Sequence, residues 1–204
     1  MQTFLEAKEL IVSPGVSLKT PEIACAREAG VQITGDIDIF SELVCSPIVG
    51  VTGSNGKSTV VAMLADILKK ANKSYGLGGN LDGANFKPAL DLLAEGKKDV
   101  YVLELSSFQL ETTKNLSAEV GVILNLSEDH MDRYESLDDY HRAKLNIFNS
   151  CKQLVINRDD SRSFPVAEID APVWDFGFSR PGRLCRPGAD PGVRAIRRGS
   201  GRPF

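Results

Sequence analysis

Short apolar segments alternate with helical patterns along the first 177 residues of the chain. The apolar segments occupy residues 10–12, 48–52, 100–105, 120–126 and 154–157. Such alternation is typical of a parallel sheet with helices packed on it. We therefore expect an α/β fold in which a mostly parallel sheet is flanked by helices.

Two of the intervening segments show a clear helical period. The first spans residues 57–71 and follows a glycine-rich turn. Its apolar stripe consists of Val60, Val61, Leu64, Ile67, Leu68 and Ala71. The second begins at Ser136, which has Asp139 three residues later in a capping-box pattern. Its apolar face consists of Leu137, Tyr140, Ile147, Phe148 and Cys151.

Lys144 falls in the middle of the second apolar face, so its amine is predicted to point inward. Burial lowers the pKa of a lysine and exposes a neutral amine. Such an amine could pair with an acid, contact phosphate, or react with CO₂ to form a carbamate that binds metal. The alternative is a long stem that reaches the surface and keeps its ammonium in water.

Composition narrows the classes of protein that fit. The chain has 204 residues, 42% of them hydrophobic and 25% charged, with a net charge of -3. This composition is typical of a globular protein and lacks the basic excess of a general nucleic-acid binder. No apolar run approaches the ~20 residues of a membrane span, and residues 1–10 do not resemble a signal peptide. We expect a cytoplasmic protein with free thiols, no membrane span and no nucleic-acid partner.

The last residues differ from the rest of the chain. Residues 178–204 contain seven arginines, no lysine, five glycines and four prolines, with a single acid. A segment of this composition is predicted to be disordered, or to come from a sequence that has lost its reading frame. The functional alternative is an arginine-rich arm that binds nucleic acid.

The segment from Ile48 to Thr59 reads IVGVTGSNGKST and predicts a strand, a phosphate-binding loop and the start of a helix. Its glycines allow backbone N–H groups to turn toward one point, where the helix N-terminus and Lys57 add positive potential. Ser58 is placed to bind Mg²⁺ through its hydroxyl. Val51 departs from the general phosphate-loop pattern, which has glycine at this position. A triphosphate is the expected ligand.

Polar residues follow two other apolar runs. Glu104 ends one run, and His130 follows another by a few residues. In an open α/β sheet, ligands bind beyond the carboxyl ends of the strands, so these side chains are expected near the same phosphates. Glutamate oxygen suits Mg²⁺, and neutral imidazole can hold a second cation. Taken alone, Glu104 could be a solvated strand end and His130 a helix-cap residue.

Four ordered blocks together resemble the Mur ligase family. They are VTGSNGKST at 51–59, YVLELSSFQLETT at 101–113, ILNLSEDHMDRY at 123–134 and YHRAKLNIF at 140–148. The ELSSFQL segment is most similar to the branch of the family that adds D-glutamate. VSPGVSL at 12–18 and TGDIDIF at 34–40 look like the end of the family's UDP-binding domain.

The resemblance implies a fold, a reaction and a set of site residues. Residues 1–46 would be a partial Rossmann-like UDP-binding domain, 47–177 an incomplete P-loop-type ATP-binding central domain, and 178–204 the tail. The reaction implied is ATP-dependent ligation of D-glutamate to UDP-N-acetylmuramoyl-L-alanine through an acyl phosphate, in peptidoglycan precursor synthesis. The cofactors implied are ATP and two Mg²⁺ ions, and the protein is expected to act as a monomer.

The resemblance also implies roles for specific residues. The ATP phosphates would be bound by Gly53, Ser54, Asn55, Gly56, Lys57, Ser58 and Thr59. The first metal would be held by Ser58 and Glu104, and the second by His130 and a carbamylated Lys144. Catalytic roles would fall to Lys57, Lys144 and His130. The UDP-sugar substrate would contact Ser13, Pro14, Gly15, Asn80 and Ser106.

The family pattern is shortened at both ends, and this limits the expected activity. A complete family member has three domains and more than twice this length, and its C-terminal domain helps to bind the incoming amino acid. We therefore expect this chain alone not to catalyse ligation. The alternatives are a free-standing P-loop ATPase or phosphotransferase and a non-catalytic nucleotide-binding fragment.

Overall fold

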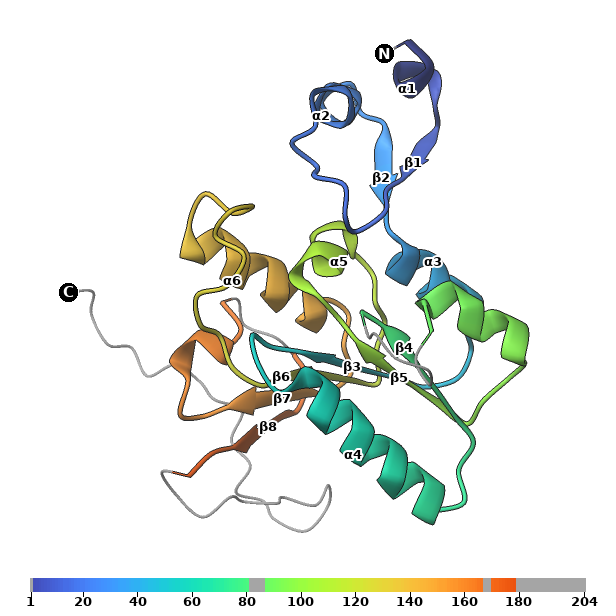
Figure 1. The fold of residues 1–204 in the computed structure, drawn as a ribbon, viewed down its shortest axis with the longest axis vertical. Coiled ribbons are helices and arrows are strands. Elements are labelled where there is room, and N and C mark those ends of the chain that lie inside the picture. The colour runs from blue at the N-terminus through green and yellow to red at the C-terminus, as the bar shows by residue number, and fades with distance from the viewer. Residues whose placement is uncertain (1, 81–86, 167–169, 179–204) are drawn as a thin grey trace, which may run out of the picture.

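A computed structural model describes residues 2–80, 87–166 and 170–178 of the chain (Figure 1). Its main feature is a six-stranded, fully parallel sheet in the order β4-β5-β3-β6-β7-β8. The strands are β3 (Ile48–Thr52), β4 (Tyr75–Gly79), β5 (Val100–Glu104), β6 (Val120–Ile123), β7 (Leu154–Asn157) and β8 (Val173–Phe176). The predicted α/β fold with a mostly parallel sheet is confirmed.

Helices cover both faces of this sheet (Figure 1). Helix α4 (Lys57–Lys70) packs on β3, β4 and β5 from one side. The other face carries α3 (Asp36–Leu43), α5 (Ser107–Thr112) and α6 (Leu137–Leu145). Three short 3₁₀ helices accompany the sheet: η1 (Ala89–Glu95), η2 (Asn146–Phe148) and η3 (Ser161–Ser163).

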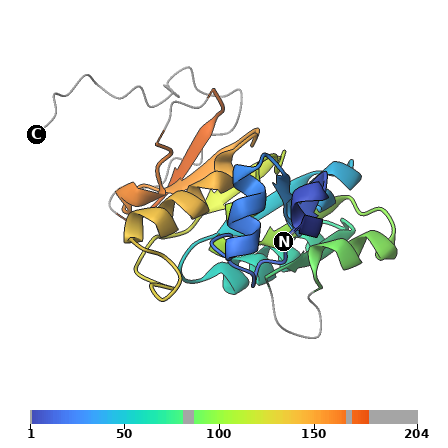
Figure 2. The same cartoon turned by 90° about the horizontal axis from the view of Figure 1, so that it is seen from above.

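Residues 2–35 form a separate small unit, seen at the top of Figure 1 and from above in Figure 2. It consists of α1 (Gln2–Glu6), β1 (Glu9–Ile11), α2 (Pro21–Glu28) and β2 (Gln32–Thr34), and its two strands pair in parallel. Val12, Ile23 and Ile33 form its small apolar core. Because parallel strands need a crossover between them, α2 connects β1 to β2 over their joint surface.

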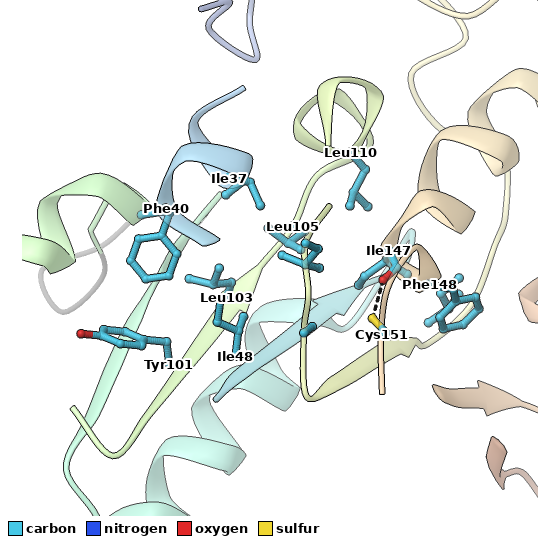
Figure 3. Close-up of a cluster of buried hydrophobic side chains, with 14 of the residues drawn as sticks. Ile37, Phe40, Ile48, Tyr101, Leu103, Leu105, Leu110, Ile147, Phe148 and Cys151 are labelled. Carbon is cyan, nitrogen blue, oxygen red and sulfur yellow. Dashed lines mark hydrogen bonds between the residues drawn. The ribbon is translucent and has the colours of Figure 1, made fainter. Parts of the chain in front are cut away.

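The main apolar core lies between the sheet and the layer of α3, α5 and η2. Figure 3 shows Leu103 and Leu105 from β5 and its end meeting Ile37 and Phe40 from α3. Phe40 also packs edge-on against Tyr101, with ring centroids 5.1 Å apart. A smaller apolar cluster on the opposite face packs against α4 and includes Val51, Val61, Val102 and Val122. The buried Val51 thus belongs to the packing of the sheet and not to the phosphate loop.

The structure changes several of the predicted element boundaries. The run at 120–126 is a strand only to Ile123, and the next residues continue in the same direction to bond Thr52 and the phosphate loop. Ile67, assigned to the buried stripe of α4, is 60% exposed. Strands β2 and β4 carry too few apolar residues to be predicted. The sequence also predicts no strand at β8, although three of its four residues are apolar. The predictions for residues 179–204 lie outside the described residues. Within the described residues, no helix is long and apolar enough to cross a membrane.

Candidate nucleotide site

The candidate site lies at the carboxyl ends of the central strands. Strand β3 has β5 on one side and β6 on the other, and both neighbours come later in the chain. The chain moves outward from β3 to β4 and later crosses to β6, which makes the end of β3 a topological switch point. Ligands of open α/β sheets bind at such points. The loop of residues 53–56 leaves the sheet here.

This loop joins β3 directly to the first turn of α4. Gly56 caps the helix with φ of 83°, a left-handed conformation that costs glycine little. Helix N-termini attract anions through unpaired N–H groups and the helix dipole. Lys57 folds back over the loop, where its Nζ donates hydrogen bonds to the carbonyl oxygens of Gly53 (3.0 Å) and Ser54 (3.3 Å). The arrangement is a preformed cationic cradle.

Ser58 and Glu104 meet beside this cradle. The Ser58 hydroxyl donates a hydrogen bond of 2.8 Å to Glu104 Oε2, across from β5. Glu104 is only 4% exposed. Two adjacent hard oxygens fit the coordination preference of Mg²⁺, so this pair could hold the first predicted metal. Thr59 follows on the exposed side of the same helical turn.

Lys144 points inward, as the helical period predicts, and the alternative in which its amine reaches solvent is wrong. The residue is 2% exposed, and its Nζ donates to Gly53 O (3.0 Å) and Thr52 Oγ1 (3.4 Å). Burial, with a smaller contribution from the positive charge of Lys57, lowers the pKa of this amine to about 7, while Asp129 and Glu104 act in the opposite direction. Two lysine amines therefore converge on the carbonyl of Gly53.

His130 lies near this cluster without touching it. Its ring packs against Phe108, with centroids 4.8 Å apart, and stands 6.3 Å from the ring centroid of Tyr140. The Nζ of Lys144 lies 4.9 Å from the same Tyr140 ring. His130 is partly exposed and its Nε2 is 3.5 Å from an oxygen of Asp129. Tyr140 thus stands between the imidazole and the buried amine.

The second predicted metal site does not fit the side chains as they stand. Within the described residues, no group of three or more histidine, cysteine, aspartate or glutamate side chains is arranged to hold a metal. The unmodified amine of Lys144 donates its hydrogen bonds to protein oxygens, so a metal at this position requires the predicted carbamate. His130 alone does not make a metal site.

The predicted substrate residues fall into two groups. Asn80 is exposed and its N–H donates to Glu104 O (2.8 Å), so it lies beside the metal-binding candidate. Ser106 is two residues beyond Glu104, where it caps α5 in a capping box with Gln109. The second group, Ser13, Pro14 and Gly15, belongs to the small N-terminal unit.

Arg133 connects the second group to the rest of the site. Its guanidinium donates to the carbonyl oxygens of Gly15 (3.2 Å) and Val16 (3.1 Å) and to Glu111 Oε2 (3.3 Å). Its Cζ lies 4.0 Å from the ring centroid of Phe108, which also contacts His130. Because Arg133 bridges the two units, the loop at 13–16 faces the same region of the central domain as His130.

Several residues of the site were not singled out from the sequence. Tyr140 Oη lies 3.0 Å from Ser54 Oγ, within hydrogen-bond distance, which ties α6 to the phosphate loop. Asn125 bonds the backbone of Asn55 in both directions. Both lie in the quoted sequence blocks, but nothing in their spacing distinguishes a loop contact from ordinary core packing. Their partners are 70 or more residues away along the chain.

Two family models and several curated proteins match the chain. Residues 51–185 match the Mur ligase middle domain, and residues 1–35 match the MurD-like N-terminal domain of Mur ligases. The chain is 50% identical over 175 residues to the UDP-N-acetylmuramoylalanine--D-glutamate ligase of Pseudomonas aeruginosa, and 46% identical over 177 residues to that of Marinobacter nauticus. These matches cover 86% and 87% of this chain, but only 38% and 39% of the two relatives.

Solved structures show the same architecture. A pseudomurein peptide ligase type C from Methanothermus fervidus aligns with 85% of this chain and 36% of its own, with a TM-score of 0.53 and 25% identity. A UDP-N-acetylmuramate:L-alanyl-gamma-D-glutamyl-meso-diaminopimelate ligase from Neisseria meningitides aligns with 83% of this chain and 58% of its own. Its TM-score of 0.56 at 17% identity supports the fold alone. By the extent of the middle-domain match, the chain belongs to the Mur ligase family.

Proposed function

We propose that this chain carries the nucleotide-binding part of an ATP-dependent ligase that joins D-glutamate to UDP-N-acetylmuramoyl-L-alanine in peptidoglycan precursor synthesis. The names of its relatives support this choice of substrates. The chain spans 38% of the length of the Pseudomonas aeruginosa relative. We expect the isolated chain to bind nucleotide without forming the amide.

The observation that carries the proposal is the contact between Ser58 and Glu104 beside the amine of Lys57. A cation, a hydroxyl and a carboxylate at one loop match the needs of a metal-bound triphosphate. A Mg²⁺ ion held by Ser58 and Glu104 would neutralise phosphate charge. Lys57 would exchange its bonds to the loop carbonyls for bonds to phosphate oxygens, while the loop N–H groups orient the γ-phosphate.

The proposed reaction proceeds in two steps. The alanyl carboxylate oxygen of the substrate attacks the γ-phosphorus and ADP leaves, which gives an acyl phosphate. The amine of D-glutamate then attacks the acyl carbon, phosphate leaves, and the nitrogen loses a proton as the amide forms. We place the UDP-sugar against Ser13, Pro14, Gly15, Asn80 and Ser106, in agreement with the bridge that Arg133 makes to the N-terminal unit.

We assign Lys144 the carbamate chemistry that the family resemblance implies. With a pKa of about 7, much of this amine is neutral near pH 7 and therefore nucleophilic toward CO₂. The nitrogen of the neutral amine would bond the carbon of CO₂ and release one proton, so that an uncharged buried amine becomes an anion. A carbamate carbon resonance in ¹³C-bicarbonate that disappears in Lys144→Met supports this assignment. Its absence from the wild type across the range from about pH 7 to about pH 9, where the amine is largely neutral, refutes it.

Titration calorimetry with Mg-ATP and Mg-ADP tests the nucleotide site. We expect the wild type to bind and Lys57→Met to bind at least about tenfold more weakly, because a charge-assisted contact to phosphate is lost. Lys69→Met, at the exposed end of α4, is the matched control and should leave affinity unchanged. No heat from a folded wild type contradicts the proposal. Hydrolysis of ATP at enzymatic rates without a UDP-sugar favours the free-standing ATPase.

A further inference from the structure

The phosphate loop is held by a second segment of the chain, residues 124–127, which extends β6 beyond the sheet. Ser54 N donates to Asn125 O (2.9 Å), and Ser127 N donates to Ser54 Oγ (2.9 Å). Ser54 Oγ donates in turn to Ser127 O (3.0 Å) or to Tyr140 Oη. Hydrogen bonds from outside the loop therefore fix much of the conformation of its backbone.

The side chain of Asn125 makes the most specific of these contacts. Its Oδ1 accepts a hydrogen bond from Asn55 N (2.9 Å), and its Nδ2 donates to Asn55 O (2.9 Å). The backbone N–H and C=O of Asn55, in the middle of the loop, are thus both paired with the side-chain amide of Asn125. Only a side chain with an acceptor and a donor at this spacing can make both bonds, so leucine makes neither and aspartate loses one.

The 124–127 segment is itself fixed from the side of β7. Asp160 Oδ2 accepts from Leu126 N (2.7 Å), and Asn157 Nδ2 donates to Leu124 O (3.0 Å). Burial raises the pKa of Asp160, but its hydrogen bonds from Leu126 and Arg162 outweigh this and keep the pKa of the carboxyl below its ordinary value, hence ionised. Asn125 therefore projects from an anchored backbone, which lets it act as a rigid support.

We infer that Asn125 is a positioning residue for the nucleotide phosphates. By pairing both backbone groups of Asn55, it holds the loop in the shape that keeps its other N–H groups turned toward the ligand. It acts through Asn55 and touches no phosphate itself. This inference rests on the proposed function, since it concerns the same nucleotide site.

Two variants separate positioning from charge. Asn125→Leu removes both bonds without adding charge, whereas Asn125→Asp keeps the acceptor, loses the donor and adds a negative charge that faces Asn55 O. Asn149→Asp is the matched control, because Asn149 is exposed and its side chain makes no hydrogen bond within the described part of the chain. Mg-ADP binding is measured by calorimetry, and exchange of single backbone amides by NMR of the free protein.

For Asn125→Leu we expect about tenfold weaker Mg-ADP binding, as loss of well-placed hydrogen bonds implies. The amide of Asn55 should exchange at least about tenfold faster while amides of β3 keep their wild-type rates. Asn125→Asp should also bind weakly at about pH 8, because its ionised carboxylate has no proton to donate to Asn55 O and repels that oxygen. Asn149→Asp should match wild type.

The outcomes distinguish this inference from the proposed function. If wild type binds Mg-ADP and Asn125→Leu binds equally well, the positioning role is wrong. It is also wrong if only the Asp variant loses affinity, since charge alone then explains the loss. If wild type binds no nucleotide, the proposed function fails, and unchanged exchange at Asn55 in Asn125→Leu would independently overturn the inference about the loop.

Discussion

At the scale of single residues, Lys144 is an ionisable side chain whose burial costs free energy. A fully buried lysine loses the hydration of its ammonium, and among the described residues two protein oxygens, Gly53 O and Thr52 Oγ1, replace it. Lys57 adds like-charge repulsion nearby. Such positions are commonly functional.

The lowered pKa makes stability depend on pH in a definite direction. The folded pKa is about 7 against a reference of 10.5, so between these values the unfolded state binds more protons and stability rises with pH. Below the folded pKa both states are protonated and the dependence vanishes. Relative to Lys144→Met, the wild type should gain about 2 kcal/mol in unfolding free energy between about pH 7 and about pH 9.

Urea unfolding of both proteins in CO₂-free buffer measures this gain, since all other titrating groups cancel in the difference. Lys69→Met serves as the control and should show the same pH dependence as the wild type. If the difference in unfolding free energy between wild type and Lys144→Met stays constant over this pH range, the amine titrates normally and is exposed to water in solution.

At the scale of elements, the edge where β4 and β5 end depends on the absence of a side chain. Gly79 has φ of 99°, and a Cβ there would lie 2.0 Å from the carbonyl oxygen of Glu104. The next residue, Asn80, donates its N–H to that same oxygen. The close approach of the two strand ends therefore places the candidate substrate residue Asn80 beside the candidate metal ligand Glu104.

Gly79→Ala should separate these strand ends. Both the left-handed backbone and the steric overlap oppose the substitution, and we expect a loss of at least about 2 kcal/mol in unfolding free energy. Chemical denaturation measures the loss. Gly15→Ala is the control, because a Cβ at Gly15 would meet no atom within 4 Å and the residue has an ordinary φ. Equal unfolding free energies for the two variants would show that the strand ends can move apart without a loss of stability.

The sequence predicts elements well where packing is local and strongly apolar. The bounds predicted for Ile48–Thr52 and Leu154–Asn157 agree with β3 and β7. It fails where tertiary contacts override the pattern. Strand β4, with the sequence YGLGG, has little apolar character of its own and forms because it pairs with β5 along its whole length. Ile67 fits the period of α4, yet it lies on the exposed side of the helix.

At the scale of the whole molecule, the N-terminal unit is joined to the larger sheet by few specific side-chain contacts among the described residues. Arg133 makes the most extensive of them, with two backbone carbonyls, a carboxylate and an aromatic face. Its ion pair with Glu111 is largely buried, with side-chain exposures of 15% and 18%. A second ion pair, Lys19 to Glu135, is exposed, and contacts of that kind contribute little stability.

Arg133→Lys should loosen this connection while preserving charge, because lysine lacks the planar fork and the stacking surface of arginine. We expect deuterium uptake of the backbone at residues 13–18 to rise several-fold, with little change in β3 or β5. Arg142→Lys provides the control, since Arg142 is exposed and pairs only loosely with Asp139 at 3.9 Å. Unchanged uptake at 13–18 would show that the N-terminal unit is held by other contacts.

The candidate site was partly predictable for a reason that operates at this scale. Parallel strands bring their carboxyl ends to one edge, so Lys57, Ser58 and Glu104 could be placed together from the order of elements alone. The roles of Asn125, Tyr140 and Arg133 could not, because each depends on a long-range contact between loops. The position of His130 beside Phe108 likewise depends on how the 127–136 segment folds over α5.

The order of strands in the sheet also governs when the nucleotide loop can take shape during synthesis. Strand β3 leaves the ribosome well before β5 and β6, which flank it, and before Asn157 and Asp160, which anchor the support behind Asn125. A nascent chain that has emerged only as far as the start of β5 therefore contains every glycine and lysine of the loop. It contains none of the supporting residues at 124–127, Asn157 and Asp160. From the positioning role inferred for Asn125, we expect nucleotide to protect the emerging polypeptide only after the stretch around Asp160 has been made.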